Sequence, residues 1–550
     1  MEDNRRRSPF DGALCICAND KSDIITIVRE YYPWRVGVDD PPSEDILHEK
    51  IGVLSEDLFG YEASKRMFLD ILNKIWDRVG RFTIVRETNS INSVYQDSYT
   101  SFYSMGHFNV SRYTERLCFF CGSFENPYLC EKMLNDAFIG TLTIYPNFSK
   151  TIGSILFNPK YFVDSSACSY LLTTEYTIDV LGAKIQFRAF PHQMQDGETL
   201  RCAEVTLNNI MEYYGRTYEE YKTLLLSDIL KMEDQLSIDR VLPSRGINYL
   251  TMSRIMKQCG VFPRLYSVRT FVRFDSTESD DEWQSEQMRR LMYYFVDSGI
   301  PVALNMCHPF NRQLAGHSII CIGYQDVKNA PRMGVELDES GFTIYDAADF
   351  YNQFVVIDDR QLPYAIRPYE NLSIFERLCV ENMLVPLHKE MYLEAYDAYK
   401  TIMSVLQNES LGIASRCKSV LKERSMVMRL VLAPSRKYRR FRMVNSSNQA
   451  EDYRRIFGEI PLPRYVWIAE LFTKNEFLKV DGGALGEIVL DATAASFGIN
   501  SIIMLNYPDS VCVRWPDWPI DALNRKVKTI ELQPFPRYKG NLQMYISNEL

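Results

Sequence analysis

Three short apolar runs in the middle of the chain constrain its fold more than any other feature. They are IPVALNM (300–306), HSIICIGY (317–324) and FTIYDAA (342–348), and each has the length and composition of a buried strand. Two segments with apolar residues at helical spacing precede them, CAEVTLNNIMEYYG (202–215) and NYLTMSRIMKQCG (248–260). Helices followed by strands, without regular alternation of the two, predict an α+β fold.

The chain is too long for one hydrophobic core. It has 550 residues, whereas single cores stop growing at roughly 250 to 300 residues. We expect a middle region at 185–365, flanked by an N-terminal α/β region at 1–184 and a C-terminal α/β region at 366–550, both of unknown role. Residues 61–79 of the N-terminal region carry the spacing of an amphipathic helix.

Net charge and composition limit which binding partners and which cellular location are expected for the protein. The net charge of −9 argues against nucleic acid as the main partner, because phosphate binding needs a basic surface. The basic strip in SRKYRRFRMV (435–444) is expected to be the solvated face of a strand. No apolar run follows the basic start, and none reaches the roughly 18 residues of a membrane span, so we predict a cytoplasmic protein without a membrane partner. The thirteen cysteines are expected to be mostly free thiols.

Cys202 is the candidate nucleophile. It stands at the predicted start of the helix 202–215, where backbone N–H groups and the helix dipole favour a thiolate. A buried helix-start cysteine without chemistry is the alternative for this residue taken alone.

His317 and Asp346 are the candidate partners of that thiol. His317 opens the strand 317–324, and a polar residue at the start of an apolar strand suits a group that faces a cleft. If strands 317–324 and 342–346 pair as an antiparallel hairpin, their opposed residues have a constant index sum, and His317 lies beside Asp346. The carboxylate would then orient the imidazole that takes the thiol proton.

A glutamine upstream of Cys202 is the candidate oxyanion donor. Gln195 and Gln193 precede the cysteine by seven and nine residues. A side-chain amide there can act with the Cys202 backbone N–H to stabilise a developing oxyanion. Gln195 is the preferred residue, and Gln193 remains a competitor.

The order of cysteine on a helix, histidine on a strand and aspartate on the next strand resembles the papain-like cysteine peptidase superfamily. Within it, the chain is most similar to the bacteriocin-processing, leader-cleaving peptidases and their relatives. The similarity lies in QDGETLRCAEVTLNNIMEYYG, LPSRGINYLTMSRIMKQCGVFPRLY, SGIPVALNM, GHSIICIGY and TIYDAAD, which span about a third of the chain. It implies a papain-like core that hydrolyses peptide or isopeptide bonds, with Cys202 as nucleophile, His317 as base, Asp346 as orienting carboxylate and Gln195 as oxyanion donor.

Two other functions use the same residues. A transglutaminase-like acyltransferase or a deamidase would share the acyl-enzyme and differ only in the acceptor, and a catalytically inactive papain-like scaffold would only bind. The partners expected are a protein or peptide substrate and a possible regulatory protein. No cofactor is expected. Cys118 and Cys121 form a CxxC pair but lack a second close pair of zinc ligands, so they are interpreted as strand residues rather than a metal site.

Overall fold

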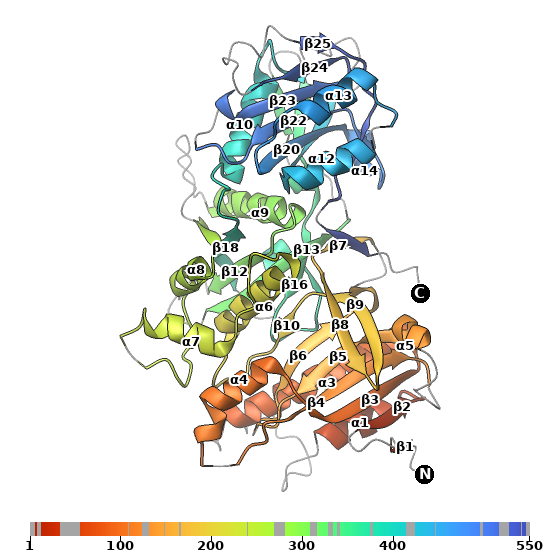
Figure 1. The fold of residues 1–550 in the computed structure, drawn as a ribbon, viewed down its shortest axis with the longest axis vertical. Coiled ribbons are helices and arrows are strands. Elements are labelled where there is room, and N and C mark those ends of the chain that lie inside the picture. Colours follow the sequence, from red (N-terminus) through yellow and green to blue (C-terminus); the bar gives the residue numbers. More distant parts are fainter. Residues whose placement is uncertain are drawn as a thin grey trace.

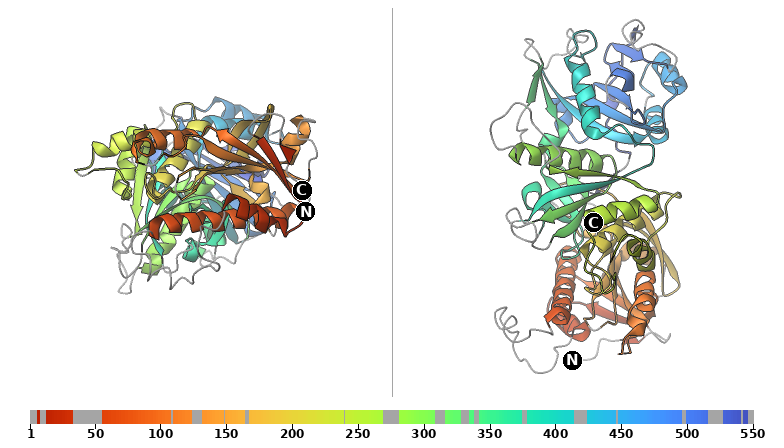
Figure 2. Two further views of the ribbon diagram at one scale, coloured as in Figure 1. Left: turned by 90° about the horizontal axis from the view of Figure 1, so that it is seen from below. Right: turned by 90° about the vertical axis from the view of Figure 1, so that its left-hand side faces the viewer.

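The computed structural model describes most of the chain, and three large sheets follow one another along the long axis of the molecule (Figures 1 and 2). Helices and strands are both abundant, in agreement with the predicted α+β class. Within the described ranges, none of the helices combines the length and apolarity needed to cross a bilayer. The described residues are 6–7, 13–32, 55–107, 109–123, 131–147, 149–163, 167–238, 240–268, 281–307, 316–327, 334–337, 342–373, 378–413, 424–445, 447–495, 499–515, 527–540 and 542–545.

The first sheet is antiparallel and packed on both faces. The predicted helix at 61–79 is confirmed as part of α3 (Ser55–Val79), which packs with α1 (Asp23–Tyr31) on one face. The hairpin β8–β9 (Thr174–Val180, Ala183–Ala189) and α5 (Glu131–Ala137) cover the other face. In spatial order the strands are β1 (Arg6–Arg7), β2 (Ala13–Ala18), β3 (Phe82–Ser90), β4 (Thr114–Cys121), β5 (Phe138–Ile144), β6 (Ile152–Phe157) and β10 (His192–Gln193).

The middle sheet carries the predicted strands 300–306 and 317–324. In spatial order its strands are β11 (Phe262–Ser267), β18 (Cys379–Leu387), β12 (Val302–Cys307), β13 (His317–Gln325), β16 (Gln353–Ile357) and β17 (Ala365–Pro368). Beside β13 lies β7 (Ser169–Leu171), which in turn pairs with β27 (Gln543–Tyr545). Both predicted helices of this region are confirmed, as α6 (Cys202–Thr217) and α8 (Tyr249–Gln258).

Both faces of the middle sheet are buried, because a different hydrophobic core lies on each side. Ile320 and Ile322 of β13 share one core with α6, α8 and the first sheet. Ile319 and Cys321, the alternating residues of the same strand, share the other core with α9 (Asp281–Asp297) and the third sheet. Side chains of a strand alternate between its two faces, so every residue of β13 is buried. The strand therefore has no polar alternation in its sequence.

The third sheet lies beyond α9. It contains β14 (Gly334–Leu337), β15 (Phe342–Asp346), β19 (Ser425–Pro434), β20 (Tyr465–Thr473), β22 (Gly486–Asp491), β23 (Ile502–Tyr507), β24 (Ser510–Val513) and β25 (Val527–Thr529). A small pair, β21 (Gly483–Ala484) with β26 (Phe535–Pro536), accompanies it. The remaining α-helices in the described part of the chain are α4 (Ser93–Ser101), α7 (Leu226–Asp234), α10 (Ala395–Gln407), α12 (Ser435–Val444), α13 (Glu451–Glu459) and α14 (Lys474–Leu478).

The predicted hairpin between strands 317–324 and 342–346 is wrong. After β13 the chain leaves the middle sheet and forms β14 and β15 in the third sheet, where β15 pairs in parallel with β19. It then returns to the middle sheet as β16, the antiparallel neighbour of β13. The sheets also cross the expected borders at 184/185 and 365/366, because β7 and β18 belong to the middle sheet.

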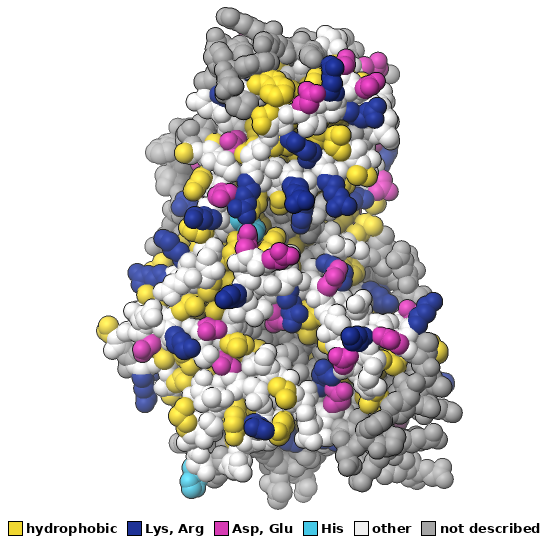
Figure 3. Space-filling view, in the orientation of Figure 1, with side chains coloured by type: hydrophobic (Ala, Val, Ile, Leu, Met, Phe, Trp, Pro, Cys, Tyr) yellow, Lys and Arg dark blue, Asp and Glu magenta, His cyan; other side chains and the backbone are white. Residues whose placement is uncertain are grey.

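The basic strip lies on a helix and not on a strand. Residues 435–444 form α12, and Lys and Arg side chains gather on the surface over this helix (Figure 3). Arg442 is the exception, since its side chain is only 2% exposed and pairs with Glu470 and Glu487. Glu470 also pairs with Arg429, which makes two hydrogen bonds to Asp297 of α9. This buried network joins α9, which packs between the middle sheet and the third sheet, to the strands of the third sheet.

Replacement of Arg429 by Met should destabilise the protein strongly. The substitution leaves the carboxylates of Asp297 and Glu470 buried without their shared cation, a change that costs about 3–5 kcal/mol in comparable networks. We expect a clearly lower urea midpoint by circular dichroism. Arg455→Met removes the exposed pair with Asp452 and should leave the midpoint unchanged; equal effects of the two variants would contradict a structural role for the network.

Candidate functional site

Cys202 is the first residue of α6, as the sequence predicts. The loop before it is fixed by Asp196, whose Oδ1 accepts hydrogen bonds from the backbone N–H groups of Glu198, Thr199 and Leu200. The helix itself is held by its buried face against the middle sheet. Backbone N–H groups at a helix start lack intrahelical acceptors and favour negative charge. The half-buried Cys202 thiol therefore lies beside the free N–H groups of the first helical turn.

His317 lies beside this thiol. It is the first residue of β13, it is 6% exposed, and its imidazole is within hydrogen-bonding reach of the Cys202 side chain. The Nε2 atom of His317 is 2.8 Å from Oδ1 of Asp358. The structure thus brings together the predicted nucleophile and the predicted base.

Asp358 occupies the place that the sequence analysis gave to Asp346. It directly follows β16, and its other oxygen, Oδ2, accepts a hydrogen bond of 2.7 Å from Gln361 Nε2. The backbone N–H of Arg360 also donates to Oδ1, at 3.0 Å. These bonds fix the carboxylate against the imidazole, which is the arrangement that orients a catalytic base and stabilises its charged form.

Asp346 is a correction to the predicted site. It ends β15 in the third sheet, where its carboxylate accepts hydrogen bonds from the Tyr294 hydroxyl and the Ala348 backbone N–H. Burial raises the pKa of Asp346, although the nearby Arg290 opposes that shift. Because β15 does not pair with β13, the carboxylate that orients His317 comes from the next strand of the middle sheet instead.

The charges at the site are strongly coupled. Burial alone would lower the pKa of His317, but its hydrogen bonds to Asp358 and Cys202, with the charges of Asp358 and Asp359, raise it to about 10. Burial opposes ionisation of Asp358 as well, yet the bond to His317 lowers the pKa of that carboxyl to about 2. The imidazolium–carboxylate pair is therefore the stable form near neutral pH.

Asp359 is a second buried carboxylate at the same place. One of its oxygens lies 3.8 Å from His317 Nε2, and among the described residues neither oxygen has a hydrogen-bond partner. Burial and the adjacent Asp358 raise the pKa of Asp359 to about 7, against the attraction of His317. Ligand atoms of His317, Asp358 and Asp359 lie within 4.8 Å of one another and would suit a metal ion, but Nε2 of His317 is already hydrogen-bonded to Asp358.

The two glutamines differ in what they bind. Gln193 is 3% exposed, and its Nε2 donates to the Tyr145 hydroxyl and to the Met194 carbonyl. Its Oε1 accepts a hydrogen bond from Ser154, so both the oxygen and the nitrogen of the amide already have hydrogen-bond partners. Gln195 makes no such bonds among the described residues and lines a cavity beside the site. This difference favours Gln195 over Gln193 as the oxyanion donor.

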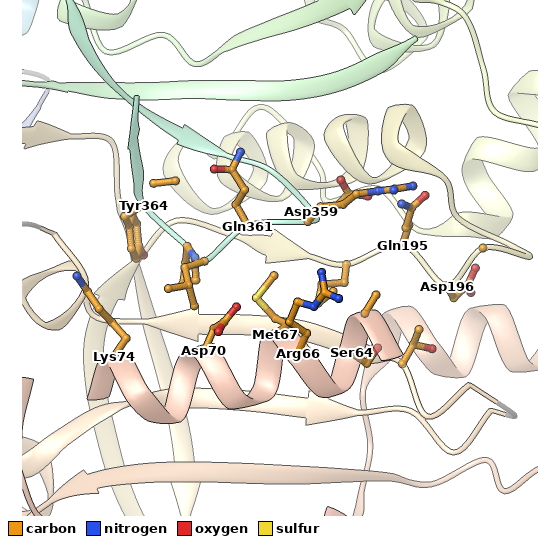
Figure 4. A pocket seen from close by; sticks show the side chains of 18 of the residues that line it. Ser64, Arg66, Met67, Asp70, Lys74, Gln195, Asp196, Asp359, Gln361 and Tyr364 are labelled. Carbon is orange, nitrogen blue, oxygen red and sulfur yellow. The ribbon is translucent and has the colours of Figure 1, made fainter. Parts of the chain in front are cut away.

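That cavity has a volume of about 1070 Å³ and adjoins the site through Gln195, Arg201 and Asp359 (Figure 4). Arg201 immediately precedes Cys202, and Asp359 immediately follows Asp358, whose carboxylate is hydrogen-bonded to His317. Ligand cavities in proteins are commonly about 300–1,000 Å³, so this one has room for several residues of a peptide.

Sequence reasoning missed three residues of the site: Asp358, Asp359 and His192. The first two stand at the end of the run QFVVIDD, which has the same strand-then-aspartate pattern as FTIYDAA. That pattern was a usable signal. His192 lies beside the Asp358 backbone, and its burial lowers the pKa of the imidazole to about 4, so the ring is neutral. No sequence pattern distinguishes His192 from an ordinary buried histidine.

No family model matches the chain, and no curated protein matches it.

The CxxC residues Cys118 and Cys121 lie on β4, where the sequence analysis expected a strand.

Asp358→Asn should slow alkylation of Cys202 at neutral pH, whereas Asp346→Asn should not. The first change replaces a charge-assisted hydrogen bond to His317, worth about 1.5–3 kcal/mol, so the alkylation rate should fall about 10- to 150-fold. The measurement is iodoacetamide labelling followed by peptide mapping, with circular dichroism to check folding. A loss in Asp346→Asn alone would show that the carboxylate has been assigned wrongly.

The His317–Asp358 pair should make the free energy of unfolding decrease as the pH becomes alkaline. The pKa of His317 rises from 6.5 to about 10 on folding, so its contribution is fully present below about pH 6.5 and is lost as the pH rises through 10. Asp358 contributes above its unfolded value of 3.8. The difference in urea midpoint between the wild type and His317→Gln should therefore be largest between about pH 4 and 6.5 and smallest above pH 10. A difference that is constant with pH would refute the raised pKa.

Proposed function

We propose that the protein is a cysteine-dependent hydrolase with a papain-like core, which cleaves a peptide or isopeptide bond in a protein substrate. The observation that carries the proposal is the chain of contacts from Cys202 at a helix start, through His317, to the buried carboxylate of Asp358. Support for the papain-like part comes from the order of these residues and from the packing of α6 on the antiparallel sheet that carries His317.

The chemistry follows from these positions. The Cys202 sulfur, having lost its proton to His317, attacks the carbonyl carbon, and the oxyanion accepts hydrogen bonds from the Cys202 N–H and the Gln195 amide. The imidazolium then gives its proton to the leaving nitrogen, which departs as an amine. Water, deprotonated by His317, attacks the acyl-enzyme and releases the acid. Asp358 keeps the ring in place and stays ionised throughout.

An acyltransferase or deamidase shares every step up to the acyl-enzyme, so it remains the alternative function. The two are separated by the acceptor. Incubation with casein and dansylcadaverine should give new peptide N-termini for a peptidase, and fluorescent casein without new termini for a transferase. The Cys202→Ala variant is the control and should give neither product.

Cys202 should be the most reactive cysteine of the folded protein. At pH 6.5 an ordinary thiol with a pKa of about 8.5 is only about 1% thiolate. A preformed thiolate–imidazolium pair should therefore let Cys202 react with iodoacetamide about 10- to 100-fold faster than the exposed Cys379. In His317→Ala this advantage should disappear, while Cys379 labels as before.

The opposite outcome is equally clear. If Cys202 labels no faster than Cys379, or if its rate is the same in His317→Ala, the thiol is not activated by the imidazole. The remaining function would then be that of an inactive binding scaffold.

A further inference from the structure

Three separate parts of the chain supply most of the lining of the cavity beside the site. One wall is residues 194–201, the segment that leads into Cys202, and a second is residues 359–367, the segment that follows Asp358. The third wall is α3 of the N-terminal region, which contributes Arg66, Asp70 and Lys74. Figure 4 shows these three side chains projecting from α3 toward the segment that carries Asp359 and Tyr364. The N-terminal region thus supplies one wall of the cavity that adjoins the site.

Helix α3 has two distinct faces. Phe68, Ile71 and Ile75 are completely buried against the first sheet. Arg66, Asp70 and Lys74 follow one another at four-residue intervals, so they form a row along the helix on a second face. Arg66 and Asp70 are exposed, and Lys74 is half-buried. One face therefore anchors the helix, and the other presents charge to the cavity.

The cavity is rich in cations although the protein is acidic. Five cationic side chains line it, against four acidic ones, in a chain whose net charge is −9. The carboxylates of two of the acids are already engaged or buried: Asp196 accepts hydrogen bonds from Tyr103 and backbone N–H groups, and both oxygens of Asp359 are buried. The other two acids of the lining are Asp70 and Glu198. The cations are Arg66, Lys74, Arg201, Arg360 and Arg367.

We propose that this cavity is the substrate cleft, that it binds an acidic segment of polypeptide, and that α3 is its specificity-determining wall. The proposal rests on the proposed function, because it takes the bound segment to lead into Cys202. The N-terminal region is then part of the substrate site, and Arg66 and Lys74 select acidic side chains by complementary charge.

Binding is measured without turnover, with the full-length Cys202→Ala protein and two fluorescein-labelled octapeptides of alternating Glu-Ala or Lys-Ala. Fluorescence anisotropy should show the Glu-Ala peptide binding at least tenfold more tightly, with an affinity that falls at 0.5 M salt. Arg66→Gln/Lys74→Gln should weaken this binding about 5- to 30-fold. The matched control is Lys222→Gln/Lys257→Gln, which removes two exposed cations outside the cavity and should have no effect.

A second measurement places the peptide at the site. In the wild type, saturating Glu-Ala peptide should protect Cys202 from iodoacetamide and leave the exposed Cys379 unprotected. Equal binding of the two peptides, equal loss in both double variants, or no protection of Cys202 would overturn the proposal. Acidic-peptide binding and protection in a protein whose Cys202 is not activated would instead refute the hydrolase and leave the cleft as a binding site for acidic polypeptide.

Discussion

The burial of both faces of the middle sheet is the constraint on which the rest of the structure depends. β13 alternates its side chains between two cores, one shared with the first sheet and one shared with the third. Neither flanking region can be removed without exposing one face of the strand that carries His317. This explains why the sheets do not divide at the borders expected from the sequence. The middle sheet separates the two cores and belongs to both. The site lies at the edge of this sheet, where β13 begins and β16 ends.

The site holds a buried ion pair, in surroundings where burying a single unpaired charge would cost considerable free energy. His317 and Asp358 are both almost completely buried, and an unpaired ion at that depth would lose its hydration without compensation. Each is stable only because the other is present, and because Gln361 and the Arg360 backbone satisfy the carboxylate. The same coupling keeps the imidazole protonated next to the helix start that carries Cys202. Asp359 adds a second carboxylate to this arrangement.

Local patterns in the sequence were enough to predict helices α6 and α8, strands β12 and β13, and two of the three side chains that the structure brings together. Cys202 and His317 sit at the starts of a helix and a strand, positions that hydrophobic periodicity identifies directly. The orienting carboxylate was missed because consecutive strands were assumed to be neighbours. Between β13 and β16 the chain instead forms two strands of the third sheet. The short polar sequences that connect these strands do not indicate which sheet the next strand joins. Asp346 and Asp358 follow similar strands, so only the strand order separates them.

Strand β27 has a consequence for how the protein is made. It pairs with β7, which pairs with β13, so the middle sheet is complete only when residues far apart in the chain have met. From Gln325 at the end of β13 to Tyr545 at the end of β27 there are 220 residues (545 − 325), which a ribosome adds in about 11 to 44 s. During that interval Cys202 and His317 have already been synthesised, but β7 lacks its outer strand. Synthesis order therefore delays completion of the sheet until nearly all of this chain has been translated.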